Sequence, residues 1–302
     1  MERIVHVCNG DCTADSLSLA DLPGEIRVWA DALDIGPVLP VGDAEHYRIR
    51  GELWGGGKHA EQLAAWDRGV DETAGAAVDE LILWFEHDLF DQLALVRLLA
   101  RLARKGLPQT LTIVSIDRHP DVPDFHSLSE LKPEQLAELW ARRTPLSRDA
   151  IDEAVTAWIA ITAADPRALP FLVKRVKALP FLSGALERHL EELPDPTSGL
   201  SRTERQLLAA LARGEAQPRL AMQAIDPRYS ITDVVLSRAK RSLTDAKLID
   251  GDAITALGRQ ALSGAIDRVH ECGIDTWRGG VHLAGKGPVW RWDSRERRLI
   301  EK

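Results

Sequence analysis

Residues 81–92 read LILWFEHDLFDQ, and this stretch decides the fold. Five apolar residues are followed at once by a polar cluster of Glu86, His87, Asp88 and Asp91. A short apolar run of this kind is typical of a strand that is buried on both faces of a parallel sheet. Open α/β sheets bind their ligands beyond the carboxyl ends of such strands. The stretch therefore predicts a buried strand with a site at its end.

Three further segments fit the same pattern. Residues 4–8, 25–29 and 110–116 are short, mostly apolar runs, and helix-like sequence separates the strands in residues 42–70 and 89–102. Strands that alternate with helices are typical of a parallel sheet with right-handed crossover connections. The predicted fold class is α/β, with a mostly parallel sheet and flanking helices.

Polar side chains follow each predicted strand, and parallel strands bring them to one edge of the sheet. These side chains are Asn9, Asp11, Asp31, Asp34, Glu86, His87, Asp88, Asp91, Asp117 and His119. Gathered carboxylates repel one another unless a cation neutralises them. We therefore expect this rim to bind a divalent cation such as Mg²⁺ or Mn²⁺, or a cationic or hydroxylated small molecule. The alternative is a rim of helix caps and salt bridges.

Length and composition indicate a globular protein of two or three domains. The chain has 302 residues, of which 45% are apolar, and a formal net charge of −8. No apolar run approaches the roughly 20 residues that cross a bilayer, and no signal-peptide pattern precedes the first strand. Three cysteines in so long a chain argue against a disulfide framework. We expect a cytoplasmic protein with no membrane partner.

Sequence composition divides the chain into three parts. The α/β pattern fills residues 1–128, and a helical connector follows in residues 129–196. The segment PDPTSG at residues 194–199 has the composition of a linker. Residues 197–302 form a predicted winged-helix-like domain, and its tail at residues 277–293 alternates like a hairpin that seals a domain interface. The alternative is that the aromatic residues between the arginines of this tail stack on nucleic-acid bases.

Charge is distributed unevenly along the chain. Residues 1–128 contain 11 basic and 22 acidic residues, a net charge of −11. Residues 199–302 contain 18 basic and 13 acidic residues, a net charge of +5. The acidic part argues against nucleic-acid contact there and is compatible with a cation, whereas the basic part permits contact with phosphate.

The third part has the element order of a winged helix. A capping box at Ser201 opens the first helix, two more helices follow, and a tight hairpin is predicted at residues 248–255. In many winged helices the third helix enters the major groove, which would aim Arg238, Lys240 and Arg241 at DNA. The same fold often serves instead as a protein-binding or lid module, and a net charge of +5 is modest.

Several well-defined chemical motifs are missing. The chain has no GxGxxG dinucleotide loop, no GxSxG nucleophile turn and no HExxH metal motif. The segment GGGKH at residues 55–59 lacks the spacing and the hydroxyl residue of a phosphate-binding P-loop. The motifs therefore leave the reaction chemistry open.

Three segments together resemble the bacterial family called domain of unknown function 1835. They are NGD at residues 9–11, WADALDIGP at residues 29–37 and FEHDLFDQ at residues 85–92. The resemblance covers about residues 1–125, and the remainder resembles the helical and winged-helix-like extension of some members. The resemblance implies these boundaries and a bacterial cytoplasmic setting. The family has no established activity, so nothing about the reaction follows from it.

Two functions of different classes follow from these patterns. The first is a cation-assisted enzyme that acts on a small phosphorylated or nucleotide-like molecule. Its site would comprise metal ligands Asp11, Asp31 and Asp88, a catalytic pair of His87 and Asp88, ligand-binding residues Asn9, Asp34 and Asp91, and an anion clamp of Arg142 and Arg143. The second is a ligand-responsive DNA-binding transcriptional regulator, in which the rim senses the ligand and Arg238, Lys240 and Arg241 contact DNA. Turnover that needs His87 would indicate the enzyme, and salt-dependent DNA binding would indicate the regulator.

Overall fold

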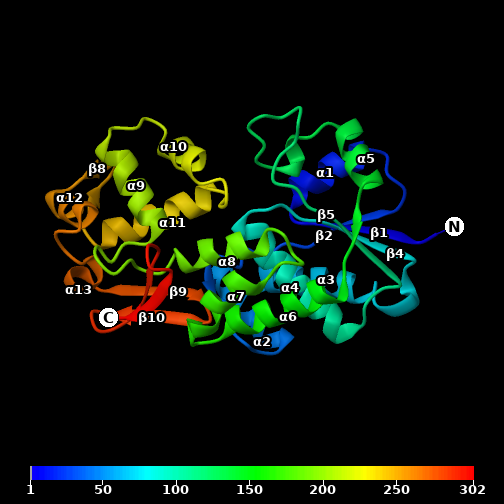
Figure 1. The fold of residues 1–302 in the computed structure, drawn as a ribbon, viewed down its shortest axis with the longest axis horizontal. Coiled ribbons are helices and arrows are strands. Elements are labelled where there is room, and N and C mark those ends of the chain that lie inside the picture. The colour runs from blue at the N-terminus through cyan, green and yellow to red at the C-terminus, as the bar shows by residue number, and fades with distance from the viewer. Residues whose placement is uncertain (1) are drawn as a thin grey trace.

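Five strands form the central sheet of the computed structural model, which describes residues 2–302 (Figure 1). Their order is β2-β1-β4-β5-β6, and the first four run parallel. The parallel strands are β1 (Ile4–Cys8), β2 (Glu25–Val28), β4 (Glu80–Trp84) and β5 (Thr110–Val114). All four lie where the sequence predicts strands, so the α/β fold class is confirmed.

The fifth strand, β6 (Thr144–Pro145), pairs with β5 in the antiparallel direction. It comes from residues predicted to belong to the helical connector, so the sheet extends past the predicted boundary at residue 128. The chain turns back here because Arg142 ends the preceding helix, and the amide of Leu146 then donates to the carbonyl of Leu111 at 2.9 Å.

Helices cover both faces of the sheet. They are α1 (Asp11–Leu19), α3 (Gly57–Asp71), α4 (Leu89–Lys105) and α5 (Pro133–Ala141), while α2 (Asp43–Trp54) packs on α3. In Figure 1, α1 and α5 lie above the sheet and α3 and α4 lie below it. Leu81 and Leu83 of β4 join the hydrophobic core on the α4 side, whereas Ile82 and Trp84 join the one on the α1 side. Because side chains alternate across a strand, β4 is buried on both faces, as its apolar run predicts.

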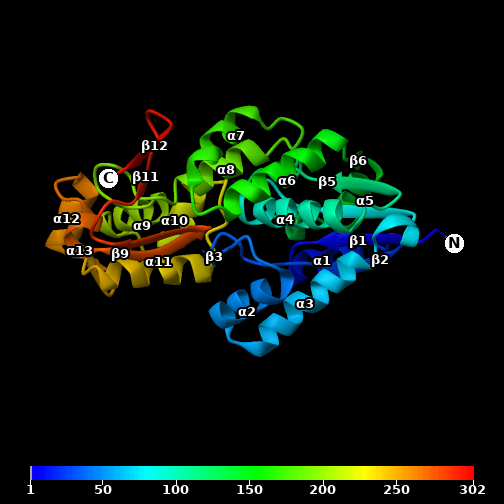
Figure 2. The same ribbon diagram turned by 90° about the horizontal axis from the view of Figure 1, so that it is seen from below.

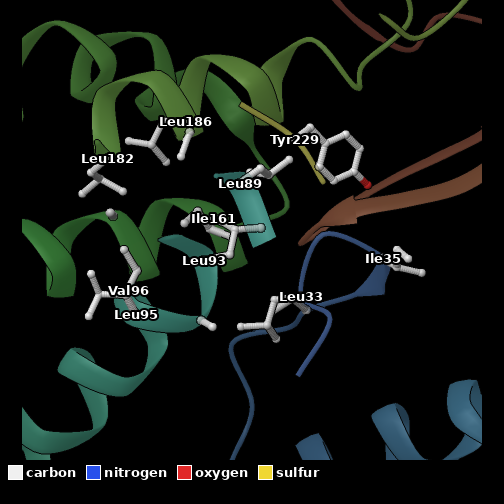
Figure 3. Close-up of a cluster of buried hydrophobic side chains, with 14 of the residues drawn as sticks. Leu33, Ile35, Leu89, Leu93, Leu95, Val96, Ile161, Leu182, Leu186 and Tyr229 are labelled. Atoms are coloured by element: carbon white, nitrogen blue, oxygen red, sulfur yellow. The ribbon is translucent and has the colours of Figure 1, made fainter. Parts of the chain in front are cut away.

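Three helices of the connector pack beside α4. They are α6 (Arg148–Thr162), α7 (Leu169–Arg175) and α8 (Leu182–Leu190), and α4 contacts both α6 and α8. Figure 3 shows Leu93, Ile161 and Leu186 of α4, α6 and α8 in one buried cluster. Three short 3₁₀ helices lie elsewhere in the fold, at Gly75–Ala77, Leu128–Glu130 and Pro166–Ala168. The same hydrophobic core continues to Trp292 near the end of the chain, so all three predicted parts share it.

Residues 197–302, which we call the C-terminal unit, begin with the predicted helices and hairpin. These elements are α9 (Arg202–Ala212), α10 (Pro218–Ile225), α11 (Asp233–Asp245), β7 (Ile249–Asp250) and β8 (Ala253–Ile254). The capping box is present, with Ser201 and Glu204 bonded to each other's amides. Two further helices follow, α12 (Ala256–Ser263) and α13 (Arg268–Cys272). No helix within residues 2–302 is long and apolar enough to span a membrane.

The tail forms two hairpins, so the prediction of a single hairpin is wrong. They pair β9 (Ile274–Gly279) with β10 (Val281–Gly285), and β11 (Trp290–Asp293) with β12 (Arg298–Glu301). Strand β3 (Gly36–Pro37), from the loop after β2, adds to β9 in parallel (Figure 2). The first hairpin thus joins the N-terminal part to the C-terminal unit through backbone hydrogen bonds.

The predicted linker at residues 194–199 is a buried turn. The side chain of Asp195 accepts hydrogen bonds from the amides of Thr197 and Ser198, both at 2.8 Å. Pro194, Ser198 and Gly199 are buried. The composition correctly indicates a turn, but the flanking units pack around this turn and remove the flexibility of a linker.

Candidate functional site

Strands β1 and β4 lie side by side at the centre of the sheet, and the chain leaves them in opposite directions. The crevice beyond the carboxyl ends of such a pair is where open α/β sheets bind ligands. Asn9 follows β1, and its side-chain amide donates a hydrogen bond to Asp91, which follows β4. The structure thus brings Asn9 and Asp91, two residues that the sequence predicts for the site, together at this crevice.

Glu86, Asp88 and Asp91 form a buried cluster at the end of β4, and each has a protein partner. Asp91 Oδ2 accepts from the amide of Glu86 at 2.5 Å, and Asp88 Oδ1 accepts from the amide of Asp91 at 2.9 Å and thereby caps α4. Glu86 Oε1 accepts from the amide of Leu128 at 2.7 Å and from the hydroxyl of Ser127 at 3.0 Å. These bonds hold the rim together and commit the carboxylates to structural roles.

Burial changes the protonation of this cluster. It raises the pKa of Glu86 to about 8, with a further contribution from the charge of Asp88. It also raises the pKa of Asp88 to about 6 and the pKa of Asp91 well above its ordinary value. Protonation can therefore relieve the mutual repulsion of these carboxylates. The sequence predicts a bound cation because of this repulsion. Within residues 2–302, no group of three His, Cys, Asp or Glu side chains is arranged to hold a metal ion.

The other two predicted metal ligands lie apart from this cluster. Asp31 is buried and paired with Arg50, whose Nη2 lies 2.7 Å from Asp31 Oδ1, and His46 Nε2 lies 3.3 Å from Oδ2. Burial alone would raise the pKa of Asp31, but Arg50 and His46 outweigh it and hold this pKa below its ordinary value. Asp11 is exposed in the first turn of α1. The structure does not bring Asp11, Asp31 and Asp88 into one ligand set.

The C-terminal unit covers the rim with the loop between α10 and α11. The carbonyl of Pro227 lies 2.9 Å from His87 Nε2, and the carbonyl of Arg228 accepts from the amide of Leu89 at 2.9 Å. The hydroxyl of Tyr229 donates to Asp34 Oδ2 at 2.6 Å. Figure 3 shows Tyr229 beside Leu89 at the edge of the buried cluster. The predicted catalytic residue His87 is therefore engaged by this loop.

The two arginines of the predicted anion clamp lie away from this cluster. Arg143 is paired with Glu80 at the start of β4, with Nε 2.7 Å from Oε1, and its guanidinium lies over Trp140. Arg142 is exposed. Both line a cavity of about 330 Å³ beside β5, together with Gln92 and other residues. The bond to Glu80 directs Arg143 toward the opposite end of β4 from the rim.

A larger cavity of about 690 Å³ lies between the N-terminal part, the end of the connector and the C-terminal unit. Asp34, Leu53 and Glu192 line it. Its lining also includes the arginine residues Arg238, Arg241, Arg268 and Arg278. The sequence predicts neither this cavity nor the roles of Arg268 and Arg278. The basic composition of residues 199–302 is the one feature of the sequence that indicates arginines at a site in this part of the chain.

Two of these arginines lack acidic partners, and a third, Arg268, has only one. Arg238 and Arg241 have no salt bridge and no side-chain hydrogen bond among residues 2–302, and the guanidinium of Arg238 lies 5.1 Å from the ring centre of Trp54. Arg268 is only 4% exposed, yet its Nε and Nη1 atoms have no hydrogen-bond partner. The nearest carboxylate oxygen to Arg268 belongs to Glu204, 3.5 Å from its Nη2. These arginines therefore keep free hydrogen-bond donors, although the acidic residues Asp34, Glu192, Glu204, Asp245 and Asp275 line the same cavity.

Neighbouring charges affect the arginines of this cavity. Partial burial, followed by the charges of Arg241 and Arg50, lowers the pKa of Arg238 from its ordinary value. Arg278 is partly compensated, because its Nε donates to the carbonyl of Glu192 at 3.1 Å. A negatively charged group in this space would find several guanidinium donors at once.

The predicted DNA-reading residues of α11 do not share one open surface. Arg238 and Arg241 line the cavity, and Arg238 contacts Trp54 of α2. Lys240 instead pairs with Asp252 of the β7–β8 turn, with Nζ 2.5 Å from Oδ1. The contact of these three residues with DNA stays a prediction.

Comparison of the chain with known protein families and with curated proteins finds no match. The resemblance to domain of unknown function 1835 therefore stays a prediction. The function must be argued from the site itself, because the fold alone hosts many activities.

Proposed function

We propose that the chain binds a small phosphate-bearing molecule in the cavity between its N-terminal part and its C-terminal unit. The observation that carries the proposal is that guanidinium donors of Arg238, Arg241 and Arg268, which line this cavity, have no hydrogen-bond partner among residues 2–302. Arg268 is the buried arginine of the three, whereas Arg238 is half-buried and Arg241 is exposed. Two other buried arginines have closer carboxylate partners than Arg268 has. Arg50 pairs with Asp31, and Arg188 pairs with Glu192 and Asp226.

The energetic argument concerns desolvation. Removing a guanidinium from water without a partner is costly, so buried arginines are normally paired. Arg268 is almost fully buried and is satisfied only through its Nη2, which donates to Ser242 at 2.8 Å. A phosphate offers several strong acceptor oxygens, and guanidinium groups match their geometry in pairs. An anionic ligand would therefore offer acceptor oxygens to guanidinium donors that the folded chain leaves without partners.

The size of the cavity supports a small ligand. Its volume of about 690 Å³ lies within the range of roughly 300–1,000 Å³ that is typical of small-molecule sites. Such a volume accommodates a sugar phosphate or a mononucleotide. It does not accommodate a DNA duplex, whose major groove would have to surround α11. The enclosure of Arg238 between α11 and Trp54 favours a small phosphate over DNA.

Calorimetric titration with inorganic phosphate, ribose 5-phosphate and adenosine monophosphate tests the proposal. The variant Arg238→Ala/Arg241→Ala should weaken binding of at least one of these probes by tenfold or more. Its matched control is Arg259→Ala/Arg298→Ala, which removes the same charge from exposed residues outside the cavity. The control should bind as the wild type does.

Two results would overturn the proposal. One is that the wild type binds none of the three probes at millimolar concentration. The other is that both double variants bind equally well, since the cavity arginines would then be irrelevant. Retention of labelled duplex DNA at low salt, lost only in Arg238→Ala/Arg241→Ala, would favour the DNA-binding alternative instead.

A further inference from the structure

Asp34 also lines the large cavity, and one of its carboxylate oxygens is unused. The side chain is only 6% exposed. Its Oδ2 accepts the hydrogen bond from the hydroxyl of Tyr229 at 2.6 Å, whereas Oδ1 is buried without a partner among residues 2–302. A buried acceptor that lacks a donor is uncommon in folded proteins and calls for an explanation.

The protein's nearby cations do not satisfy this oxygen. Arg50 is committed to Asp31 and to the carbonyls of Ala32 and Ile35, at 2.7 and 2.5 Å. Arg238 lies over the ring of Trp54 and forms no salt bridge with Asp34. Burial raises the pKa of Asp34 above its ordinary value, as expected for a carboxyl group with too few donors.

We propose that Asp34 selects ligands that carry a hydroxyl or amino group in addition to a phosphate. The inference rests on the proposed function, because it assumes that the phosphate binds to the arginines of the same cavity. One molecule would then have its anionic end at Arg238, Arg241 and Arg268, and a hydrogen-bond donor at Asp34 Oδ1. The class of ligand is a phosphorylated polyol, sugar or nucleoside rather than a bare phosphate or an alkyl phosphate.

Tyr229 acts as a positioning residue in this arrangement. Its hydroxyl occupies Oδ2 and thereby leaves Oδ1 as the oxygen available to a ligand. A site with a buried acceptor discriminates against a ligand that has no donor, because the acceptor stays unsatisfied in that complex. The expected preference is about tenfold to a hundredfold.

Two probes of similar size separate this effect from phosphate binding. Ribose 5-phosphate carries hydroxyl groups on its ring, whereas cyclopentylmethyl phosphate has a five-membered ring and a phosphate without ring hydroxyls. Wild-type protein should bind ribose 5-phosphate at least tenfold more tightly. In Asp34→Asn, which keeps the shape of the side chain but presents an amide, this preference should fall below threefold. Its affinity for cyclopentylmethyl phosphate should stay within threefold of the wild type.

The control variant is Asp275→Asn. Asp275 lines the same cavity, but its side chain is 84% exposed and pairs with His282. This variant changes the charge of the cavity equally and should keep the preference. Asp34→Ala provides a second variant, and circular dichroism checks that each protein is folded.

The outcomes distinguish the two proposals. Equal affinity of the wild type for both probes, with both affinities lost in Arg238→Ala/Arg241→Ala, would overturn the role of Asp34 and keep the phosphate site. A preference for ribose 5-phosphate that persists in folded Asp34→Asn and Asp34→Ala would also overturn the role of Asp34. Failure of the wild type to bind either probe would overturn the phosphate site itself.

Discussion

The hydroxyl of Tyr229 and the carboxylate of Asp34 meet at 2.6 Å although the two residues are 195 positions apart in the sequence. Both side chains are buried. The same loop of the C-terminal unit binds His87 through the carbonyl of Pro227. This contact therefore ties the C-terminal unit to the strand-end rim and marks the border between the rim and the large cavity.

Removal of the Tyr229 hydroxyl should destabilise the protein. In Tyr229→Phe the buried Asp34 loses its side-chain donor, and we expect the free energy of unfolding at pH 7 to fall by about 1–3 kcal/mol. Loss of the donor raises the pKa of Asp34 further in the folded state. The folded variant then binds more protons than the folded wild type does. Its loss of unfolding free energy should therefore grow as pH rises and shrink toward pH 4.

Urea denaturation of wild type and variant at pH 4.5 and pH 7 measures this difference. Tyr47→Phe is the matched control, because Tyr47 also donates to a carboxylate, Asp67, at 2.7 Å. Asp67 keeps its bonds to Arg97 and Trp29, so the control should lose less stability. An equal loss at both pH values in Tyr229→Phe would contradict the assignment to Asp34.

The pair of Arg50 and Asp31 should be a structural ion pair rather than part of a ligand site. Arg50→Met leaves Asp31 buried with only His46 beside it, and we expect a loss of about 3–5 kcal/mol at pH 7. The folded pKa of Asp31 is depressed in the wild type, so the pair stabilises the fold above the unfolded pKa of about 3.9. Without Arg50, burial should raise the pKa of Asp31 in the folded variant, so this carboxyl group takes up a proton as pH falls from 7 toward 4 and the loss of stability shrinks.

Arg48→Met provides the control on the same helix. Arg48 pairs only with exposed Glu45 and Glu52, so its replacement should cost much less stability than that of Arg50. Guanidinium denaturation of both variants at pH 4 and pH 7 is the measurement. An equally small loss of unfolding free energy in Arg50→Met and Arg48→Met would show that the fold does not depend on the pairing of Asp31 with Arg50.

The buried rim should make the protein less stable at alkaline pH. The folded pKa of Glu86 is about 8, whereas an unfolded glutamate has a pKa of about 4.3. The folded state thus holds an extra proton between these values, and the free energy of unfolding falls as pH rises through this window. Glu86→Gln resembles the protonated form, so it should reduce this decline by at least ~1 kcal/mol between pH 5 and pH 8.

Thermal or urea unfolding across this pH range tests the effect. Glu134→Gln removes the same charge at an exposed position and should follow the wild-type profile. Parallel profiles for Glu86→Gln and wild type would argue against a proton on Glu86 in the folded state.

Gly280 should be required for the close packing of the C-terminal tail against the end of the connector helix α6. A Cβ atom at this position would lie 2.0 Å from the carbonyl oxygen of Thr162 and 2.6 Å from that of Ala163. The amide of Gly280 also donates to Ile161 at 2.8 Å, which holds the chain close. Gly280→Ala should therefore cost about 1–3 kcal/mol or more through forced displacement.

The comparison variant is Gly287→Ala, since a Cβ atom at Gly287 meets no atom within 4 Å. It should change the free energy of unfolding by less than about 1 kcal/mol. Chemical denaturation of both variants is sufficient. If Gly280→Ala were as stable as Gly287→Ala, this would contradict the close packing of the tail on the end of α6.

Local patterns in the sequence determined most of the secondary structure. The apolar run of β4 predicts its burial on both faces, and the capping box of Ser201 and Glu204 predicts the start of α9. These signals suffice because strand burial and helix capping depend on residues that are close in the sequence. The sequence also placed Asn9, Glu86 and Asp91 at one edge, because parallel strands end together.

Only the tertiary structure decided what the charged side chains do. Asp31 pairs with Arg50, Glu86 is buried with a raised pKa, and Arg238 faces a cavity rather than solvent. The pairing of β3 with β9 likewise joins segments that no local pattern relates. The physical reason is that ionisation and pairing depend on burial and on partners supplied by other units. Those partners become known only when the units are packed together.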